Sequence, residues 1–241
     1  MYYSEKEFLY KLLTDKRSLI HAIDFALEAA FPYPKRCLSY DILVSLNIER
    51  AKIGLLPNRR PGDVDILILP IQAEEILYDY AIAIEAKIFR PTLKNPGKNV
   101  NKFGLSQALG LRRDGFPFVG LLHIALPENT PHQLRPKIPL MENKLDGKGN
   151  LLFSGQHIAI DPFSLMAAYR QEGRLKAKQI PPDISYKVLA FEISQNGSLI
   201  ANTVGFSYSG HKNPFYSKKV EKLLTNFYQK NSEFFTKISW F

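Results

Sequence analysis

The fold is decided by residues 59–91, RRPGDVDILILPIQAEEILYDYAIAIEAKIFRP. This stretch contains two apolar runs of strand length, DVDILILPI and YAIAIEAKIF. The acidic segment QAEEILYD between them is predicted to form a hairpin connection or a longer loop. The second run holds Glu85 and Lys87 among apolar residues, where charged side chains are rare.

Alternation along a strand predicts where these charges point. Residues two apart share one face, so Asp63 and Asp65 share a face of the first strand, and Glu85 and Lys87 share a face of the second. Buried charges need partners, so we expect strand pairing to gather these side chains at one end of a sheet. The neighbours expected to point the other way, into apolar packing, are Val64, Ile66, Ile84, Ala86 and Ile88.

Convergent carboxylates next to a lysine are suited to one kind of chemistry. Mg²⁺ prefers oxygen ligands and commonly takes one or two protein carboxylates while it keeps several waters. Such a metal lowers the pKa of a bound water and stabilises phosphoryl oxygens. A neighbouring lysine can position that water or offset the charge on the phosphate. The residues therefore favour hydrolysis of a phosphodiester.

The pair PGDVDILIL and AIAIEAKIF resembles the motif of the PD-(D/E)XK nuclease superfamily. The resemblance implies α/β architecture, with a restriction-endonuclease-like mixed β-sheet flanked by helices. It implies Mg²⁺-dependent cleavage of nucleic acid, DNA ahead of RNA, with Mn²⁺ able to substitute. Asp65 and Glu85 would bind the metal with the carbonyl of Ala86, and Lys87 would be the catalytic lysine. Asp63 stays open as the rival or accessory ligand, because the motif proline lies two residues before it.

The same resemblance suggests two supporting residues. Many members carry a glutamine near the start of the following helix, where Gln107 lies, and some use an acid on an N-terminal helix, for which Glu28 is the candidate. The order helix, strand, strand, helix, strand across residues 16–126 agrees with the family core. Two other acid-x-Lys triplets, at 142–144 and 146–148, lack apolar flanks and are set aside.

Basic residues surround the motif. The chain has 241 residues, with 32 Lys and Arg against 23 Asp and Glu, which gives a net charge of +9. A surplus of this size fits a polyanionic partner, although for any single residue a solvated surface is the plainer interpretation. The residues predicted to bind nucleic acid are Arg59, Arg60, Arg90, Lys94, Lys98 and Lys102.

The rest of the chain is predicted to build around this core. Residues 1–127 are the nuclease-like core with its N-terminal helices, and residues 128–241 are a C-terminal extension packed on the same domain. Residues 39–51 are ambiguous between helix and strand. The further expectations are two helices in 4–30, a helix at 105–115, a strand at 116–127, a long polar loop at 128–149, a helix at 161–171, a β-hairpin in 185–209 with a two-residue Asn196-Gly197 turn, and an amphipathic helix within 217–235.

Composition excludes several classes. One cysteine, Cys37, rules out an internal disulfide and a cysteine-based zinc site. No apolar run reaches the length of a membrane span, and the N-terminus lacks a signal-peptide pattern, so we expect a cytoplasmic protein. His123, within an apolar run, is interpreted as a core residue.

Three functional readings remain open. The first is a nuclease, for which a homodimer is an option when both strands are cut. The second is a non-catalytic module that binds nucleic acid or protein on a nuclease-like fold. The third is an unrelated α/β protein in which the motif is a coincidence.

Overall fold

A computed structural model describes residues 3–32, 41–55, 63–100, 103–194, 196–203 and 207–239. The helices are α1 (Glu5–Thr14), α2 (Lys16–Ala30), α3 (Arg50–Ile53), α4 (Leu105–Asp114), α5 (Pro162–Lys176) and α6 (Lys218–Lys230), with 3₁₀ turns η3 (Tyr78–Tyr80), η4 (His132–Leu134) and η5 (Ser232–Phe234). The strands are β1 (Asp41–Ile48), β2 (Val64–Gln72), β3 (Glu75–Ile76), β4 (Ile82–Phe89), β5 (Phe118–Ala125), β6 (Lys137–Leu145), β7 (Leu151–Ala159), β8 (Ile184–Ile193), β9 (Leu199–Thr203) and β10 (Thr236–Ser239).

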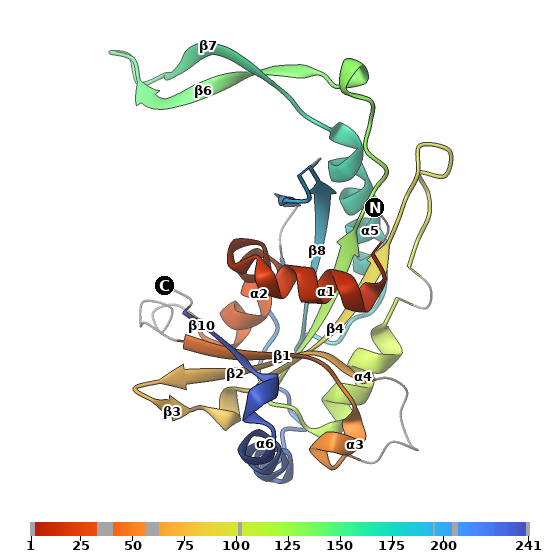
Figure 1. Cartoon of the computed structure of the whole chain (residues 1–241), viewed down its shortest axis with the longest axis vertical. Helices are drawn as coiled ribbons and strands as arrows, with labels where there is room; N and C mark the ends of the chain where they lie inside the picture. The colour runs from red at the N-terminus through yellow and green to blue at the C-terminus, as the bar shows by residue number, and fades with distance from the viewer. Residues whose placement is uncertain are drawn as a thin grey trace.

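Eight of the strands form one mixed sheet. Its order is β10-β1-β2-β4-β5-β8-β9, and β3 pairs with β2. The pairs β4–β5 and β5–β8 are parallel, and the other neighbours are antiparallel. Strands from residues 128–241 therefore join the same sheet as those from the first half of the chain (Figure 1).

Helices cover both faces of this sheet, so the body has three layers. On one face, α1 and α2 contribute Phe8 and Phe25 to a core with Ile84 and Leu122 of the sheet. On the other, apolar residues of α4, α5 and α6 pack on the opposite sides of the same strands. The protein is thus a mixed α/β fold, in agreement with the coarse prediction.

Local signals explain the helix boundaries. The Ser4 hydroxyl accepts from the Glu7 amide at 3.2 Å, and the Glu7 carboxylate accepts from the Ser4 amide at 2.6 Å, which is a complete capping box. Asp15 caps α2 through the Ser18 amide. The prediction of two helices in residues 4–30 is confirmed, as are those of α4, α5, α6 and β5.

The ambiguous segment became a strand because of its neighbours. β1 lies between β2 and β10, so its backbone groups are paired on both edges over Asp41–Val44. Local propensity does not decide such a segment, because burial between two strands does.

The predicted long loop at 128–149 is wrong. Residues 137–145 form β6, which pairs with β7 in a separate two-stranded sheet, and we call residues 137–159 the arm. Prolines and charged residues hid the strand, since an exposed ribbon shows no buried apolar face. The two rejected triplets lie in β6 and in its turn.

The second hairpin forms as β8 and β9, but its predicted two-residue turn is also wrong. The Ser194 amide donates to the Ser198 carbonyl at 3.0 Å, so the connection is longer than Asn196-Gly197. In the part of the chain that the structure describes, no helix combines the length and apolar character needed to cross a membrane.

Candidate active site where β2 and β4 diverge

The candidate site begins where a strand ladder stops. β2 and β4 pair from Ile68–Ile82 to Ile66–Ile84, and the next residues outward are Asp65 and Glu85. β4 continues to pair with β5 as far as Phe89. The edge of β4 that faced β2 is therefore left open beyond Ile84.

Two carboxylates occupy this open edge. Asp65 Oδ2 accepts a hydrogen bond from the Ala86 amide at 2.8 Å. Glu5 Oε2, in the first turn of α1, accepts one from the Ile88 amide at 3.2 Å. Backbone donors that lose a ladder partner need another acceptor, and these acids supply it.

Glu85 and Lys87 lie side by side on the face toward α4. Glu85 is 0% exposed, and its Oε1 lies 2.5 Å from Lys87 Nζ. Lys87 Nζ also lies 3.4 Å from Glu5 Oε1. Among the described residues, neither Glu85 oxygen has a hydrogen-bond partner of acceptable geometry. A buried carboxylate with unused lone pairs is costly and favours binding of a proton or a cation.

The electrostatics follow from burial and crowding. Burial raises the pKa of Asp65 to about 6, against the opposing effects of the Ala86 amide and the Lys87 charge. Burial and the neighbouring Asp65 charge raise the pKa of Glu85 to about 8. For Lys87, burial lowers the pKa, but Glu85, Asp65 and Glu5 outweigh it and the net pKa is raised. Near neutral pH Asp65 is thus mostly ionised, whereas Glu85 retains a proton that a cation can displace.

The start of α4 closes the site from the other side. Gly104 precedes this helix with φ of +66°, and a β-carbon there would lie 3.0 Å from the Cγ atoms of both Glu85 and Lys87. Only glycine fits this close approach without strain. Gln107 lies in the first turn of the same helix and is half-buried, and its supporting role stays a prediction.

His123 fixes the corner that leads into α4. It pairs in register with Lys87 and is 0% exposed. Its Nε2 lies 2.9 Å from the Phe103 carbonyl and its Nδ1 lies 3.0 Å from the Gln171 amide nitrogen, which assigns the proton to Nε2. Burial lowers its pKa to about 4, so the ring is neutral. Its interpretation as a core residue is confirmed.

The structure separates the two rival aspartates. Asp63 is exposed and precedes β2, whereas Asp65 reaches the β4 backbone. The prediction that Val64 shares a face with Ile66 is wrong, since Val64 belongs to the core on the α4 side of the sheet. Asn47, opposite Asp65 in the β1–β2 register, has φ of +52°, and this breaks the alternation at that level.

The helix acid at the site is Glu5 and not Glu28. Glu28, on α2, accepts a hydrogen bond from the Ser209 hydroxyl at 3.3 Å. The sequence shows Glu5 only as part of a capped first turn, and nothing in it reveals that this turn rests against β4. Glu5 is therefore the site residue that sequence reasoning missed.

Asp65 and Glu85 are the residues that could hold a metal ion. Within the described ranges, no group of three or more His, Cys, Asp or Glu side chains is arranged as a metal site. Mg²⁺ needs fewer protein ligands than that, because water completes its shell. Glu85 Oε2, which has no partner among the described residues, fits such an ion. The Ala86 carbonyl shares the open edge of β4 with its own amide and fits as a further oxygen ligand.

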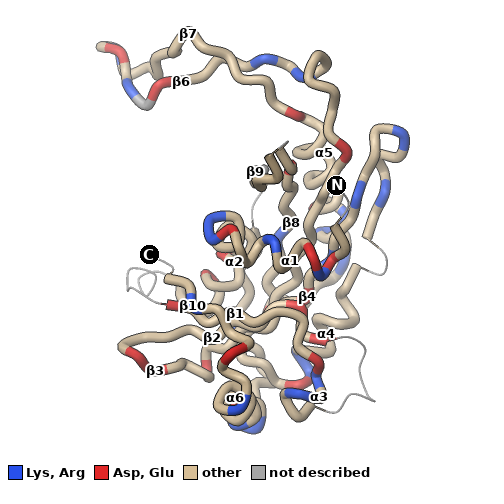
Figure 2. Tube along the Cα trace, viewed as in Figure 1, with Lys and Arg blue, Asp and Glu red and all other residues tan. Residues whose placement is uncertain are grey.

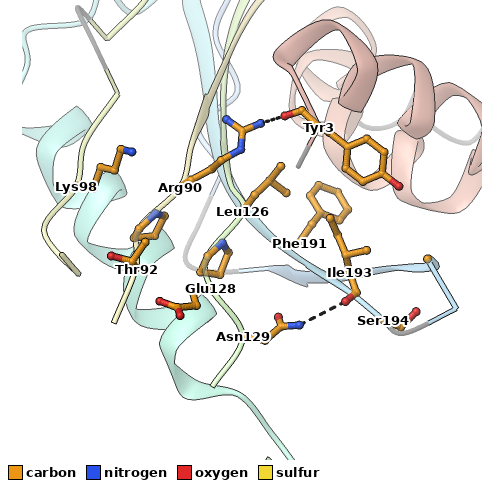
Figure 3. A pocket seen from close by; sticks show the side chains of 13 residues that line it. Tyr3, Arg90, Thr92, Lys98, Leu126, Glu128, Asn129, Phe191, Ile193 and Ser194 are labelled. Atoms are coloured by element: carbon orange, nitrogen blue, oxygen red, sulfur yellow. Dashed lines mark hydrogen bonds between the residues drawn. The ribbon is translucent and has the colours of Figure 1, made fainter. Parts of the chain in front are cut away.

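A pocket of about 550 Å³ opens beyond the carboxyl ends of β4 and β5 (Figure 3). Arg90 donates to the Tyr3 carbonyl, and both line the pocket, as do Lys98, Asn129 and Phe191. Tyr3 lines the pocket and Glu5, two residues later, contacts Lys87, so one short segment touches both the pocket and the site. The pocket combines an apolar wall with cations at its rim.

The predicted basic residues fall into three groups. Lys94 and Lys98 are exposed in the loop after β4, and Arg174 fastens this loop by donating to the Gly97 carbonyl at 2.8 Å. Arg90 lies at the pocket. The remaining three, Arg59, Arg60 and Lys102, lie outside the described residues.

No protein-family model, curated protein or solved structure matches this chain.

Proposed function

We propose that this protein is a metal-dependent nuclease of the PD-(D/E)XK type with a restriction-endonuclease-like core, acting on DNA ahead of RNA. One observation carries the proposal. Glu85 is fully buried next to Asp65, its Oε1 pairs with Lys87 Nζ at 2.5 Å, and its Oε2 has no hydrogen-bond partner among the described residues. The ion pair with Lys87 uses Oε1 alone and leaves the buried Oε2 open to a further ligand.

Each residue has a role in this proposal. Asp65 and Glu85, with the Ala86 carbonyl, hold Mg²⁺ or Mn²⁺, which supplies an activated water and stabilises phosphoryl oxygens. Lys87 keeps its charge because three acids surround it, so it can orient the attacking water or bind a phosphate oxygen. Glu5 holds the Lys87 ammonium from the opposite side at 3.4 Å. Gln107 supports the site from α4.

Nucleic acid is the proposed partner, with a second copy of the chain when both strands are cut. Arg90, Lys94 and Lys98 would contact phosphates, and each contact makes binding weaken with salt. Lys98 lines the pocket and Lys94 does not. If the strand runs through the pocket, Lys98→Ala lowers DNA affinity more than the matched variant Lys94→Ala.

The test is cleavage of plasmid, single-stranded DNA and RNA with Mg²⁺ or Mn²⁺. Lys87→Ala and Glu85→Gln are expected to lose at least ~10²-fold in rate, the range for loss of an acid–base or charge-stabilising group. Glu142→Gln and Lys144→Ala are the matched controls, because that triplet has the same spacing on β6. Equal cleavage by all variants would refute the site.

A second candidate is a binding module without catalysis. Asp65 and Glu5 both spend a carboxylate oxygen on β4 amides, which is a structural task. This candidate predicts salt-sensitive DNA binding and no cleavage with either metal. It also predicts that Mg²⁺ leaves the thermal unfolding midpoint unchanged, whereas the nuclease proposal predicts a rise that Glu85→Gln abolishes.

A further inference from the structure

The arm projects away from the body and exposes apolar side chains along its length (Figure 1). It consists of two nine-residue strands, β6 and β7, which pair with each other in a sheet of their own. Its large apolar side chains that are more than one-third exposed are Ile138, Leu140, Met141, Leu145, Leu151, Leu152, Phe153 and Ile158.

These side chains lie on both faces of the ribbon. Leu151, Leu152 and Phe153 are consecutive, and successive strand residues point to opposite faces. Neither face of the ribbon is therefore the polar face that a strand normally presents to water. A lone two-stranded hairpin is marginally stable in water, so an arm of this composition requires a covering surface.

The arm is built as an ordered ribbon. At its tip, Asp146 Oδ1 accepts from the Lys148 amide at 2.7 Å and from the Asn150 amide at 2.8 Å, which holds the turn. At its base, Asp161 Oδ2 accepts from the Thr130 amide at 2.7 Å and lies 3.3 Å from Arg135. Hydrogen bonds thus fix both the tip and the base of the arm, and the apolar side chains between them are exposed to solvent.

The charges of the arm disfavour nucleic acid as its partner. β7 has no charged residue, and the colouring by charge shows the arm as mostly uncharged (Figure 2). A ribbon that binds a polyanion is expected to carry a clear basic surplus. The charged residues of the arm nearly balance, being Lys137, Lys144, Lys148, Glu142 and Asp146.

Three more exposed apolar side chains flank the arm in the chain. Leu134 precedes β6, and Met166 and Tyr169, three residues apart on one face of α5, follow β7. We call these three residues the base patch. When an arm and a patch adjoin on one subunit, a two-fold axis can place each arm on the partner's patch and close the assembly.

We propose that the arm is a dimerisation element that packs on the base patch and the arm of a second copy of this chain. Two nine-residue strands, their turn and the base patch supply a surface close to the ~20–30 residues per side of a standard stable interface. The proposal does not depend on nuclease activity, because a dimer can form whether or not the site cleaves DNA.

The test compares molar mass in solution by light scattering. Wild type is expected to have the mass of two 27.5 kDa chains, and Leu151→Ser/Phe153→Ser the mass of one. The control Leu93→Ser/Phe234→Ser changes side chains of similar exposure outside the arm, 45% and 51% against 44% and 62%, and is expected to stay dimeric. Circular dichroism checks that each variant is folded.

A second readout uses no variant. Lys137, Lys144 and Lys148 are exposed, so trypsin cleaves the arm of a monomer. Cleavage there is expected to slow as the protein concentration rises from about 1 to about 100 µM, by mass action. A wild type with the mass of one chain at the higher concentration overturns the proposal, as does an arm variant that remains dimeric. Loss of DNA binding with no change in mass would assign the arm to nucleic acid instead.

Discussion

Lys87 and Lys187 lie at adjacent levels of the sheet, on opposite faces, and each is paired with a carboxylate. Lys87 is in register with His123, and Lys187 is in register with Leu122, the preceding residue of β5. Lys187 Nζ donates to both oxygens of Asp24, at 2.6 and 2.8 Å, and to a backbone carbonyl at 2.8 Å. All three of its protons have acceptors.

The Lys87 pair is incomplete by the same measure. Glu85 Oε1 lies 2.5 Å from Lys87 Nζ, but the buried Oε2 has no hydrogen bond among the described residues, and the Asp65 charge lies close by. A pair in which every polar atom has a partner stabilises the fold. A pair with an unpartnered buried oxygen can still bind a proton or a cation. Both pairs contain buried charged groups, so burial alone does not identify a candidate site. What distinguishes the Lys87 pair is a buried polar atom that has no hydrogen-bond partner among the described residues.

The largest expected effect is a difference in DNA cleavage rate between variants of the two lysines. Lys87→Met is expected to lower the DNA cleavage rate by at least ~10²-fold, while Lys187→Met leaves it within about threefold per folded molecule. Single-turnover rates with Mg²⁺ at saturating protein check this. Equal losses in both variants would mean that the two lysines are equally structural.

Stability is expected to show the opposite order. Lys187→Met leaves Asp24 facing a buried region and lowers the free energy of unfolding by about 2 kcal/mol, a value reduced because the Asp24 side chain is 28% exposed. Glu85→Gln/Lys87→Met removes the incomplete pair and raises it by roughly 1 kcal/mol. Urea unfolding without divalent metal measures both, and a large destabilisation by the double variant would contradict the assignment.

A pH series sharpens the same contrast. The pKa values of Asp65 and Glu85 are raised to about 6 and about 8, so the stability they contribute is present below ~4 and is lost as pH rises through these values. Without divalent metal, the unfolding midpoint of wild type minus that of Glu85→Gln is expected to fall from pH 5 to pH 8. Mg²⁺ is expected to stabilise wild type more at pH 8 than at pH 5, because it binds the ionised acids.

His123 acts in the opposite direction, so the difference against Glu85→Gln is the quantity to follow. Its pKa is lowered to about 4, and the stability it contributes is present above ~6.5 and lost as pH falls toward 4. A difference curve that is flat between pH 5 and pH 8 would show that Glu85 titrates normally.

The smallest expected effect concerns the wall of the site. Gly104→Ala places a β-carbon 3.0 Å from the side chains of both Glu85 and Lys87 and is expected to lower the cleavage rate about tenfold. Gly149→Ala is the matched control, since its φ is +83° and nothing lies within 4 Å of the added carbon. Both variants cost ~1–2 kcal/mol of backbone strain, and only the first disturbs the site.

The motif and its strands were predictable because they depend on local pattern. Alternation in β4 places Glu85 and Lys87 on one face correctly, and the capping box defines α1, whereas Asp65 lies where the alternation of β2 breaks. Asp63 could not be separated from Asp65 in the sequence, because both lie on the expected face before the strand. Which of the two aspartates reaches β4 depends on where the β2–β4 ladder stops. That point is set by how β1, β2 and β4 pair with one another.

Other features depend on contacts that no local pattern encodes. Glu5 reaches Ile88 across 83 positions of the chain, and the motif gives no sign of it. Gly104 is required because α4 begins directly above two side chains of β4. β6 was predicted as part of a loop because its apolar residues show no buried face within a single chain.

The pairing of β1 with β10 has a consequence for biosynthesis. β10 follows β1 by roughly 190 residues, which at ~5–20 residues per second is about 10–40 s of translation. During that interval the edge of β1 over Asp41–Val44 that β10 later covers has no partner, although β2 has already been made. Nascent chains are therefore vulnerable to edge-to-edge association at this strand, and slower growth at low temperature, or chaperones that shield such edges, would raise the yield of folded protein.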